Sequence, residues 1–160
     1  MKKFSDFKPI KKPIIIKESD ESDQIEDVQI TQVAYQTDIA KFFSKLFESR
    51  EVAHIYHLQI QGEGSYVAHL ALNEYYDNIL ELIDELIEVY QGQYDIIENY
   101  DIINPDITLS KDKIDYFIEL ADFIKNNKNC ILPDDTHLLS IVDEVLILIY
   151  KTLYKLKTLK

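Results

Sequence analysis

Residues 57–92 read HLQIQGEGSYVAHLALNEYYDNILELIDELIEVYQG, and this stretch decides the fold. Gly62 and Gly64 interrupt a helical pattern near its start, and Ser65 is a residue type that often caps a new helix. Apolar residues then recur at steps of three and four residues as far as Gly92, which is typical of an amphipathic helix closed by a glycine. The stretch therefore predicts the end of one helix, a short turn and a second long helix.

The sequence on either side extends this pattern to four helices. Apolar periodicity predicts them at about 31–61, 65–91, 110–126 and from 133 onwards. The connection at 93–109 is long for a bundle loop and contains Pro105, so it predicts a crossover along the bundle. Two helices, a long crossover and two more helices predict an all-α, ferritin-like four-helix bundle.

The first thirty residues lack helical periodicity and predict an extended N-terminal arm that precedes a bundle domain at 31–160. The arm is basic at first and then acidic over 18–23. Its lysines are Lys2, Lys3, Lys8, Lys11, Lys12 and Lys17. With Asp6 they give residues 1–17 a charge of +5, while the whole chain carries -12. An acidic body with a basic arm suggests either a cation-binding body with an anion-binding arm, or a well-solvated body with a disordered tail.

Composition narrows the class of protein. Gly and Pro number only three and four, which favours long helices. A single cysteine, Cys130, excludes an internal disulfide framework and a cysteine-based zinc site. The N-terminal segment lacks the apolar core of a signal peptide, and no apolar run approaches the roughly 20 residues of a membrane span. A soluble, cytoplasmic protein is expected, or a virion component if the chain is phage-encoded.

Polar side chains gather on one side of the second predicted helix. At about 100° per residue, Asn73, Asp84 and Glu88 lie about 40°, 60° and 100° from His69, along the edge of the apolar stripe. Burying two carboxylates there is costly without a cation or a donor. His57 continues the buried stripe of the first helix. Imidazole and carboxylate ligands suit Fe(II), Zn or Mn, so the sequence predicts a metal site.

This spacing resembles the ferroxidase site of Dps proteins, the mini-ferritins. That family has a His, a second His twelve residues on, an Asp after four, an Asp after eleven and a Glu after four. Here His57, His69, Asn73, Asp84 and Glu88 stand at those intervals without a gap. The resemblance is close over these residues and looser over the whole helix order.

The resemblance implies a function and partners. His57 and His69 of one subunit would meet Asp84 and Glu88 of its neighbour at a twofold interface. The subunits would assemble into a hollow homo-oligomeric shell that oxidises and stores iron. The lysine-rich arm would bind DNA, because an acidic body alone repels phosphate.

Two departures from the family weaken the ferroxidase interpretation. Asn73 replaces a carboxylate ligand, and Leu58 stands where the family usually has Trp. The chain also resembles Dps-like proteins of phages. The alternative is therefore a non-enzymatic structural or interaction protein on the same fold, with a degenerate metal site and an arm that contacts a viral structural protein.

A different di-iron arrangement is also present in the sequence. Glu51 and His54 form the Glu-x-x-His pattern of di-iron bundles, and a second such motif is required. Asp134 and His137 are its nearest candidate, although they stand in the first turn of the fourth helix.

A tyrosine cluster is expected to serve packing and subunit contact: Tyr75, Tyr76, Tyr90, Tyr94 and Tyr100.

Overall fold

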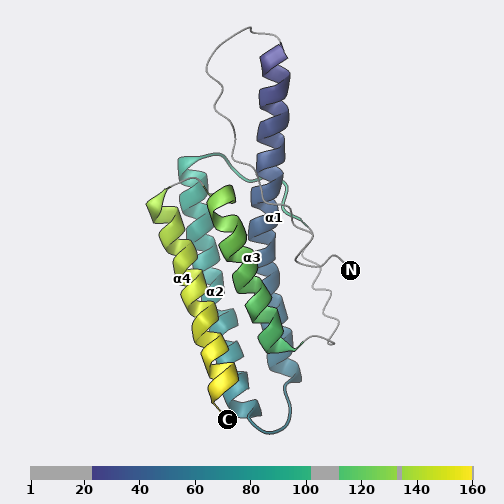
Figure 1. Cartoon of the computed structure of the whole chain (residues 1–160), viewed down its shortest axis with the longest axis vertical. Coiled ribbons are helices and arrows are strands. Elements are labelled where there is room, and N and C mark those ends of the chain that lie inside the picture. The colour runs from purple at the N-terminus through teal and green to yellow at the C-terminus, as the bar shows by residue number, and fades with distance from the viewer. Residues whose placement is uncertain (1–22, 102–111, 133–134, 160) are drawn as a thin grey trace.

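The computed structural model describes residues 23–101, 112–132 and 135–159, with side chains from residue 38 onwards except that of Cys130. These residues form four helices and no strand, so the all-α prediction is confirmed. The helices are α1 (Asp23–Gln59), α2 (Ser65–Gln93), α3 (Lys113–Ile131) and α4 (Thr136–Thr158). α1 and α4 each pack against both α2 and α3 (Figure 1).

Side-chain contacts between helices fix their directions. At the end of α2, Gln93 donates to Asp135 at 2.9 Å, directly before α4. Lys128 near the end of α3 donates to Asp143 in the first half of α4 at 2.5 Å. Both α2 and α3 therefore end where α4 begins, and they run parallel to each other (Figure 1). The end of α2 and the start of α3 therefore lie at opposite ends of the bundle.

The described part of that connection, residues 94–101, lies against α1. Ile97 is buried, and its backbone N–H donates a hydrogen bond to the side-chain oxygen of Gln91 at 3.0 Å. The backbone N–H of Asp101 donates a hydrogen bond to the buried Ser44 hydroxyl at 3.0 Å. These bonds satisfy two backbone N–H groups that have no partner within a helix. They also hold the start of the connection against α1 and α2.

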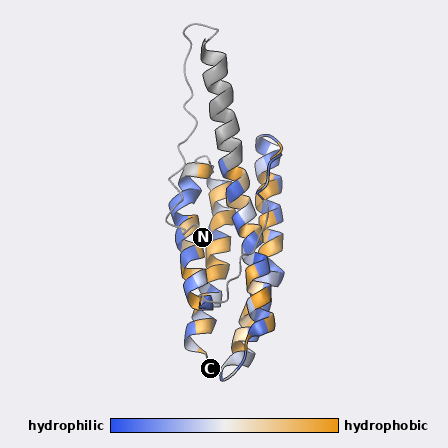
Figure 2. Cartoon of the chain, turned by 90° about the vertical axis from the view of Figure 1, so that its right-hand side faces the viewer, coloured by the Kyte–Doolittle hydropathy of each residue, from blue (hydrophilic) through white to orange (hydrophobic). Residues whose placement is uncertain are grey.

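The core is formed by aromatic and branched aliphatic residues from all four helices. The Tyr75 and Phe117 rings meet edge to face with centroids 4.7 Å apart, joining α2 to α3. Phe42 of α1 and Phe123 of α3 stack at 5.8 Å. Figure 2 shows hydrophobic and hydrophilic residues on each helix of the bundle, as expected of amphipathic helices that bury one face. None of the helices in the described ranges is long and apolar enough to cross a membrane.

Several helix limits differ from the sequence predictions. α1 begins at Asp23, so residues 23–30 are helical where the end of the non-helical N-terminal arm was expected. Ser65 is the first residue of α2 rather than its cap, because Gly64 takes the cap position with φ 75°. Gly92 lies inside the last turn of α2, without the positive φ of a glycine cap. The helix therefore continues one residue beyond it.

The third and fourth helices also differ from their predicted limits. α3 continues to Ile131, and within it the buried Asn127 amide donates to the Phe123 carbonyl at 2.7 Å. This bond satisfies an asparagine that the sequence suggested as a helix end. α3 begins at Lys113, after Asp112, whose side chain accepts the Ile114 N–H at 2.7 Å. Pro133, Asp134 and Ser110, which were expected at helix starts, lie outside the described residues.

Candidate metal centre

His57 in the last turn of α1 and His69 in the second turn of α2 lie side by side. Their rings stack with centroids 3.6 Å apart and an interplanar angle of 27°. The chain reverses between them through Gly62 and Gly64, whose φ values of 89° and 75° favour glycine. The expected proximity of these two imidazoles is therefore present within a single chain.

Reciprocal hydrogen bonds hold the two rings. Nδ1 of His57 is 3.1 Å from the His69 carbonyl oxygen, and Nδ1 of His69 is 3.3 Å from that of His57. A carbonyl only accepts, so both Nδ1 atoms carry the proton. In the neutral rings each Nε2 then carries no proton, and its lone pair can bind a metal ion. Among the described residues neither Nε2 has a hydrogen bond or an ion pair. Metal-binding histidines are commonly oriented by such a bond through the second nitrogen.

Exposure differs between the two rings. His57 is buried at 8 % exposure, whereas His69 is exposed. His69 therefore does not lie on the buried face of α2. It lies at the boundary with solvent.

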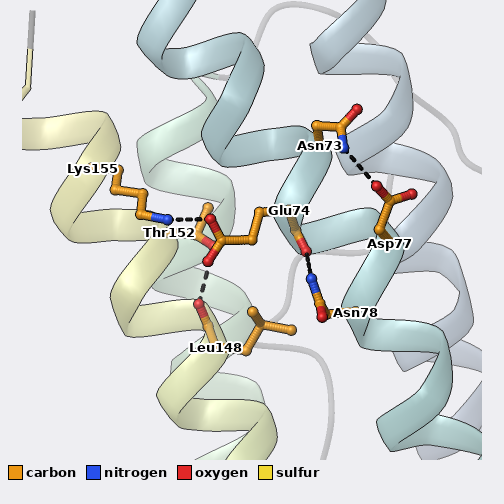
Figure 3. A network of polar contacts seen from close by, with 7 residues as sticks. All are labelled: Asn73, Glu74, Asp77, Asn78, Leu148, Thr152 and Lys155. Atoms are coloured by element: carbon orange, nitrogen blue, oxygen red, sulfur yellow. Dashed lines mark hydrogen bonds and ion pairs between the residues drawn. The ribbon is translucent and has the colours of Figure 1, made fainter.

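Tyr76 is the main neighbour of this pair. Its ring contacts His57 edge to face at 5.2 Å and lies 4.5 Å from the ring of His54. Its hydroxyl donates to Oδ1 of Asn73 at 2.7 Å, and Nδ2 of Asn73 donates to Asp77 at 2.5 Å. Figure 3 shows Asn73 and Asp77 one turn apart on α2. The Asn73 amide, which replaces the carboxylate of the family pattern, is thus engaged at both ends.

The neighbouring residue Glu74 points to the other side of α2. It forms an ion pair with Lys155 of α4, as Figure 3 shows. Asn78 donates to the Glu74 carbonyl oxygen at 2.6 Å. Glu74 therefore helps to join α2 to α4 and takes no part in the histidine pair.

Asp84 and Glu88 are both exposed in the second half of α2. Asp84 lies about 22 Å and Glu88 about 28 Å along the helix from His69, taking about 1.5 Å per residue. The argument that they are buried at a cost is therefore wrong, since water already solvates them. They line a surface pocket of about 390 Å³, whose other walls are Phe47, Ile87 and Tyr100.

The four ligand candidates thus form two separate halves in one chain. No group of three or more His, Cys, Asp or Glu side chains is placed to hold a metal ion within the described ranges. On α2 itself, His69 and Asp84 are separated by only about 60° around the helix axis. The four candidates do not meet at one point within the described chain.

The rival Glu-x-x-His arrangement does not form within one chain. His54 lies beside Tyr76, whereas His137 lies at the opposite end of the bundle, where Gln93 bonds its Nε2 at 2.7 Å. Tyr76 and Gln93 are about 25 Å apart along α2. Asp134, the other member of the second motif, lies outside the described residues.

The pocket at the acidic half was missed by sequence reasoning. Phe47 and Tyr100 contact edge to face at 6.3 Å, although they are far apart in the chain. The only signal for it was the aromatic content of the connection after α2.

The arm lysines expected to bind nucleic acid lie outside the described residues: Lys2, Lys3, Lys8, Lys11, Lys12 and Lys17.

Comparison with known proteins places the chain in a family. A family model, described as a family of unknown function (DUF5856), matches residues 57–156. The chain belongs to DUF5856. The match begins at His57 and includes α2, α3 and most of α4, so every proposed metal ligand lies within the DUF5856 region. No curated protein and no solved structure matches the chain.

Proposed function

We propose that this chain is a Dps-like iron-binding protein whose metal sites form between two copies. His57 and His69 of one copy and Asp84 and Glu88 of the other supply the ligands. The observation that carries the proposal is the pair of reciprocal Nδ1–carbonyl bonds, which leaves both Nε2 atoms unprotonated and oriented by the fold.

An antiparallel pairing of α2 with α2 of a second copy supports the arrangement. Placing His69 opposite Asp84 puts the twofold axis between Tyr76 and Asp77, because this point is midway along α2 between the two paired residues. The same operation places the second Asp84 opposite the second His69, so the dimer holds two identical sites. His69, Asp84 and Glu88 are all exposed on α2, which is a requirement for this pairing.

The ligand chemistry fits a divalent transition metal. Two neutral imidazoles and two carboxylates balance the charge of one Fe(II), Zn or Mn ion. Bound iron would supply electrons to oxygen, and the chain's residues would hold it and exclude competing ligands. Asn73 contributes no charge, and its amide is already bonded to Tyr76 and Asp77.

The helix order supports a ferritin-like shell. α2 and α3 run parallel, and the end of α2 and the start of α3 lie at opposite ends of the bundle, as in ferritin-like folds with one long crossover. We propose that dimers assemble further into a hollow shell. Cytoplasmic iron storage is the role that this architecture suits.

Aerobic addition of Fe(II), followed at the ultraviolet ferric band, tests the oxidation step. We expect the His57→Ala and Asp84→Ala variants to lose most of the rate. His137→Ala is the matched control, since His137 is an exposed histidine at the other end of the bundle. Equal rates in all four proteins would exclude ferroxidase activity.

Complementation between two inactive variants tests whether the site is shared. One variant carries His57→Ala and His69→Ala, and the other carries Asp84→Ala and Glu88→Ala. After exchange of subunits, half of the dimers are mixed and each mixed dimer has one intact site, so roughly a quarter of the metal binding returns. No recovery, despite proven subunit exchange, would contradict a site shared across the twofold axis.

The second candidate function is a non-enzymatic structural or interaction protein on the same fold, for example in a virion. The engaged Asn73 amide favours it, because the site lacks the third carboxylate of the family pattern. This candidate predicts an oligomer that binds no metal by elemental analysis. Binding of DNA or of a viral protein through the arm is tested by deleting residues 1–17, after which either interaction should disappear.

A further inference from the structure

No residue in the described part of the chain fills the pocket beside Asp84 and Glu88. Its volume is about 390 Å³, within the range of about 300–1000 Å³ seen for ligand sites. Phe47, Ile87 and Tyr100 make its walls apolar, and the two carboxylates line it as well. A ligand that matches it has an aromatic or aliphatic body and a hydrogen-bond donor at its end.

Tyr66 has this chemistry and is the most exposed large apolar residue of the described chain, at 72 % exposure. It lies in the first turn of α2, one turn before His69. An exposed aromatic side chain of this size is common in subunit interfaces, where the ring is buried and the hydroxyl finds an acceptor. Its position on α2 is about 60° from His69, the same as that of Asp84.

The antiparallel register that pairs His69 with Asp84 also places Tyr66 opposite Ile87 of the second copy. Ile87 lies in the wall of the pocket. We propose that Tyr66 of each copy inserts into the pocket of the other, so that two symmetric aromatic anchors hold the dimer. The proposal rests on the twofold pairing of the proposed function, and it holds with or without a bound metal.

The contacts available in the pocket suit a tyrosine better than a phenylalanine. The ring is placed to pack against the aromatic walls formed by Phe47 and Tyr100, which already meet edge to face. The hydroxyl donates to Glu88 or Asp84, and a bond to a charged acceptor is stronger than a neutral one. Each anchor thus buries an apolar ring and satisfies a polar group within the interface.

Sedimentation equilibrium of the full chain in EDTA tests the anchor without metal. We expect Tyr66→Ala to raise the dimer dissociation constant at least tenfold, as is usual for an aromatic hot spot, and Tyr66→Phe to raise it less. Tyr154→Ala is the matched control, because Tyr154 is also an exposed tyrosine (60 %) but lies on α4. An unchanged dissociation constant for Tyr66→Ala overturns the proposal.

Cross-linking locates the contact. A benzoylphenylalanine placed at position 66 should attach to residues 84–100 of a second, mass-labelled copy, whereas the same probe at position 154 should not. Attachment of the position-66 probe to another segment only would overturn the proposal, even if Tyr66→Ala weakened the dimer.

The same measurements separate this inference from the proposed function. A metal-free dimer that Tyr66→Ala weakens, combined with no metal binding, supports the anchor and contradicts the metal site. A dimer that binds metal and is indifferent to Tyr66→Ala supports the metal site and contradicts the anchor. A wild-type chain that stays monomeric at all concentrations contradicts both.

Discussion

The hydroxyl groups of Ser49 and Tyr75 lie 2.8 Å apart inside the core and join α1 to α2. Ser49 has one hydroxyl proton, which it donates to the Leu46 carbonyl at 2.6 Å. Tyr75 is therefore the donor of the bond between the two hydroxyls. The core thus contains a satisfied polar link among otherwise apolar side chains.

Removing that link should destabilise the bundle. Tyr75→Phe keeps the ring contact with Phe117 and loses only the hydrogen bond, so we expect a loss of about 1 kcal/mol in the free energy of unfolding. Urea denaturation measures it. Tyr154→Phe, at an exposed position on α4, is the control and should leave the stability unchanged.

Tyr116 is expected to behave in the opposite way. It is buried, and its hydroxyl has no hydrogen-bond partner in the described part of the chain. Tyr116→Phe removes a buried polar group that nothing satisfies, so the variant should be as stable as wild type or more stable by about 1 kcal/mol. A loss of stability comparable to that of Tyr75→Phe would show that the Tyr116 hydroxyl has a partner.

The same two tyrosines predict a loss of stability at alkaline pH. Burial raises the pKa of the Tyr75 and Tyr116 phenols above the ordinary value of 10.0. The unfolded chain then loses these protons at a lower pH than the folded chain. The stabilisation by the neutral phenols is fully present below about pH 10 and is lost as the pH rises through the folded pKa. Urea denaturation at pH 8 to 11 should show this decline, and the Tyr75→Phe, Tyr116→Phe double variant should show a shallower one.

Much of the fold could be predicted from sequence periodicity. The stretch at 57–92 gave the turn and the second helix, because glycines and apolar spacing are local signals. Helix limits were less accurate, since they depend on contacts that the sequence does not display. Asn127 lies within α3, with its amide bonded to a carbonyl one turn back. α1 begins at Asp23, within the predicted N-terminal arm.

The candidate site was predicted only in part for a related reason. His57 and His69 flank a short turn, so their proximity follows from the sequence. The exposure of Asp84 and Glu88 does not, because an edge position on a helical wheel is equally compatible with burial and solvent. The pocket is lined by both Phe47 of α1 and Tyr100 of the connection after α2. No local sequence pattern predicts that the connection brings these two residues together.

Restoring the missing carboxylate should strengthen metal binding and weaken the metal-free protein. In Asn73→Asp, a second carboxylate stands one turn from Asp77, where like charges cost about 0.2–0.5 kcal/mol. The Asn73–Asp77 hydrogen bond is also lost. We expect a lower melting temperature in EDTA and a larger rise on adding Zn(II) than in wild type. Asn78→Asp, an exposed change one turn further along α2, is the control and should not enlarge the rise.

The proposed dimer also makes a prediction at its axis. The register that pairs His69 with Asp84 places Asp77 of the two copies on either side of the twofold axis, where their charges repel. Asp77→Asn removes this repulsion, and the new amide oxygen still accepts from Asn73. We expect a dimer dissociation constant several-fold lower than wild type at low salt, with the difference shrinking as added salt screens the charges. Glu144→Gln makes the same charge change at an exposed position on α4 and should leave the constant unaltered. A weaker dimer for Asp77→Asn would place the twofold axis elsewhere on the molecule.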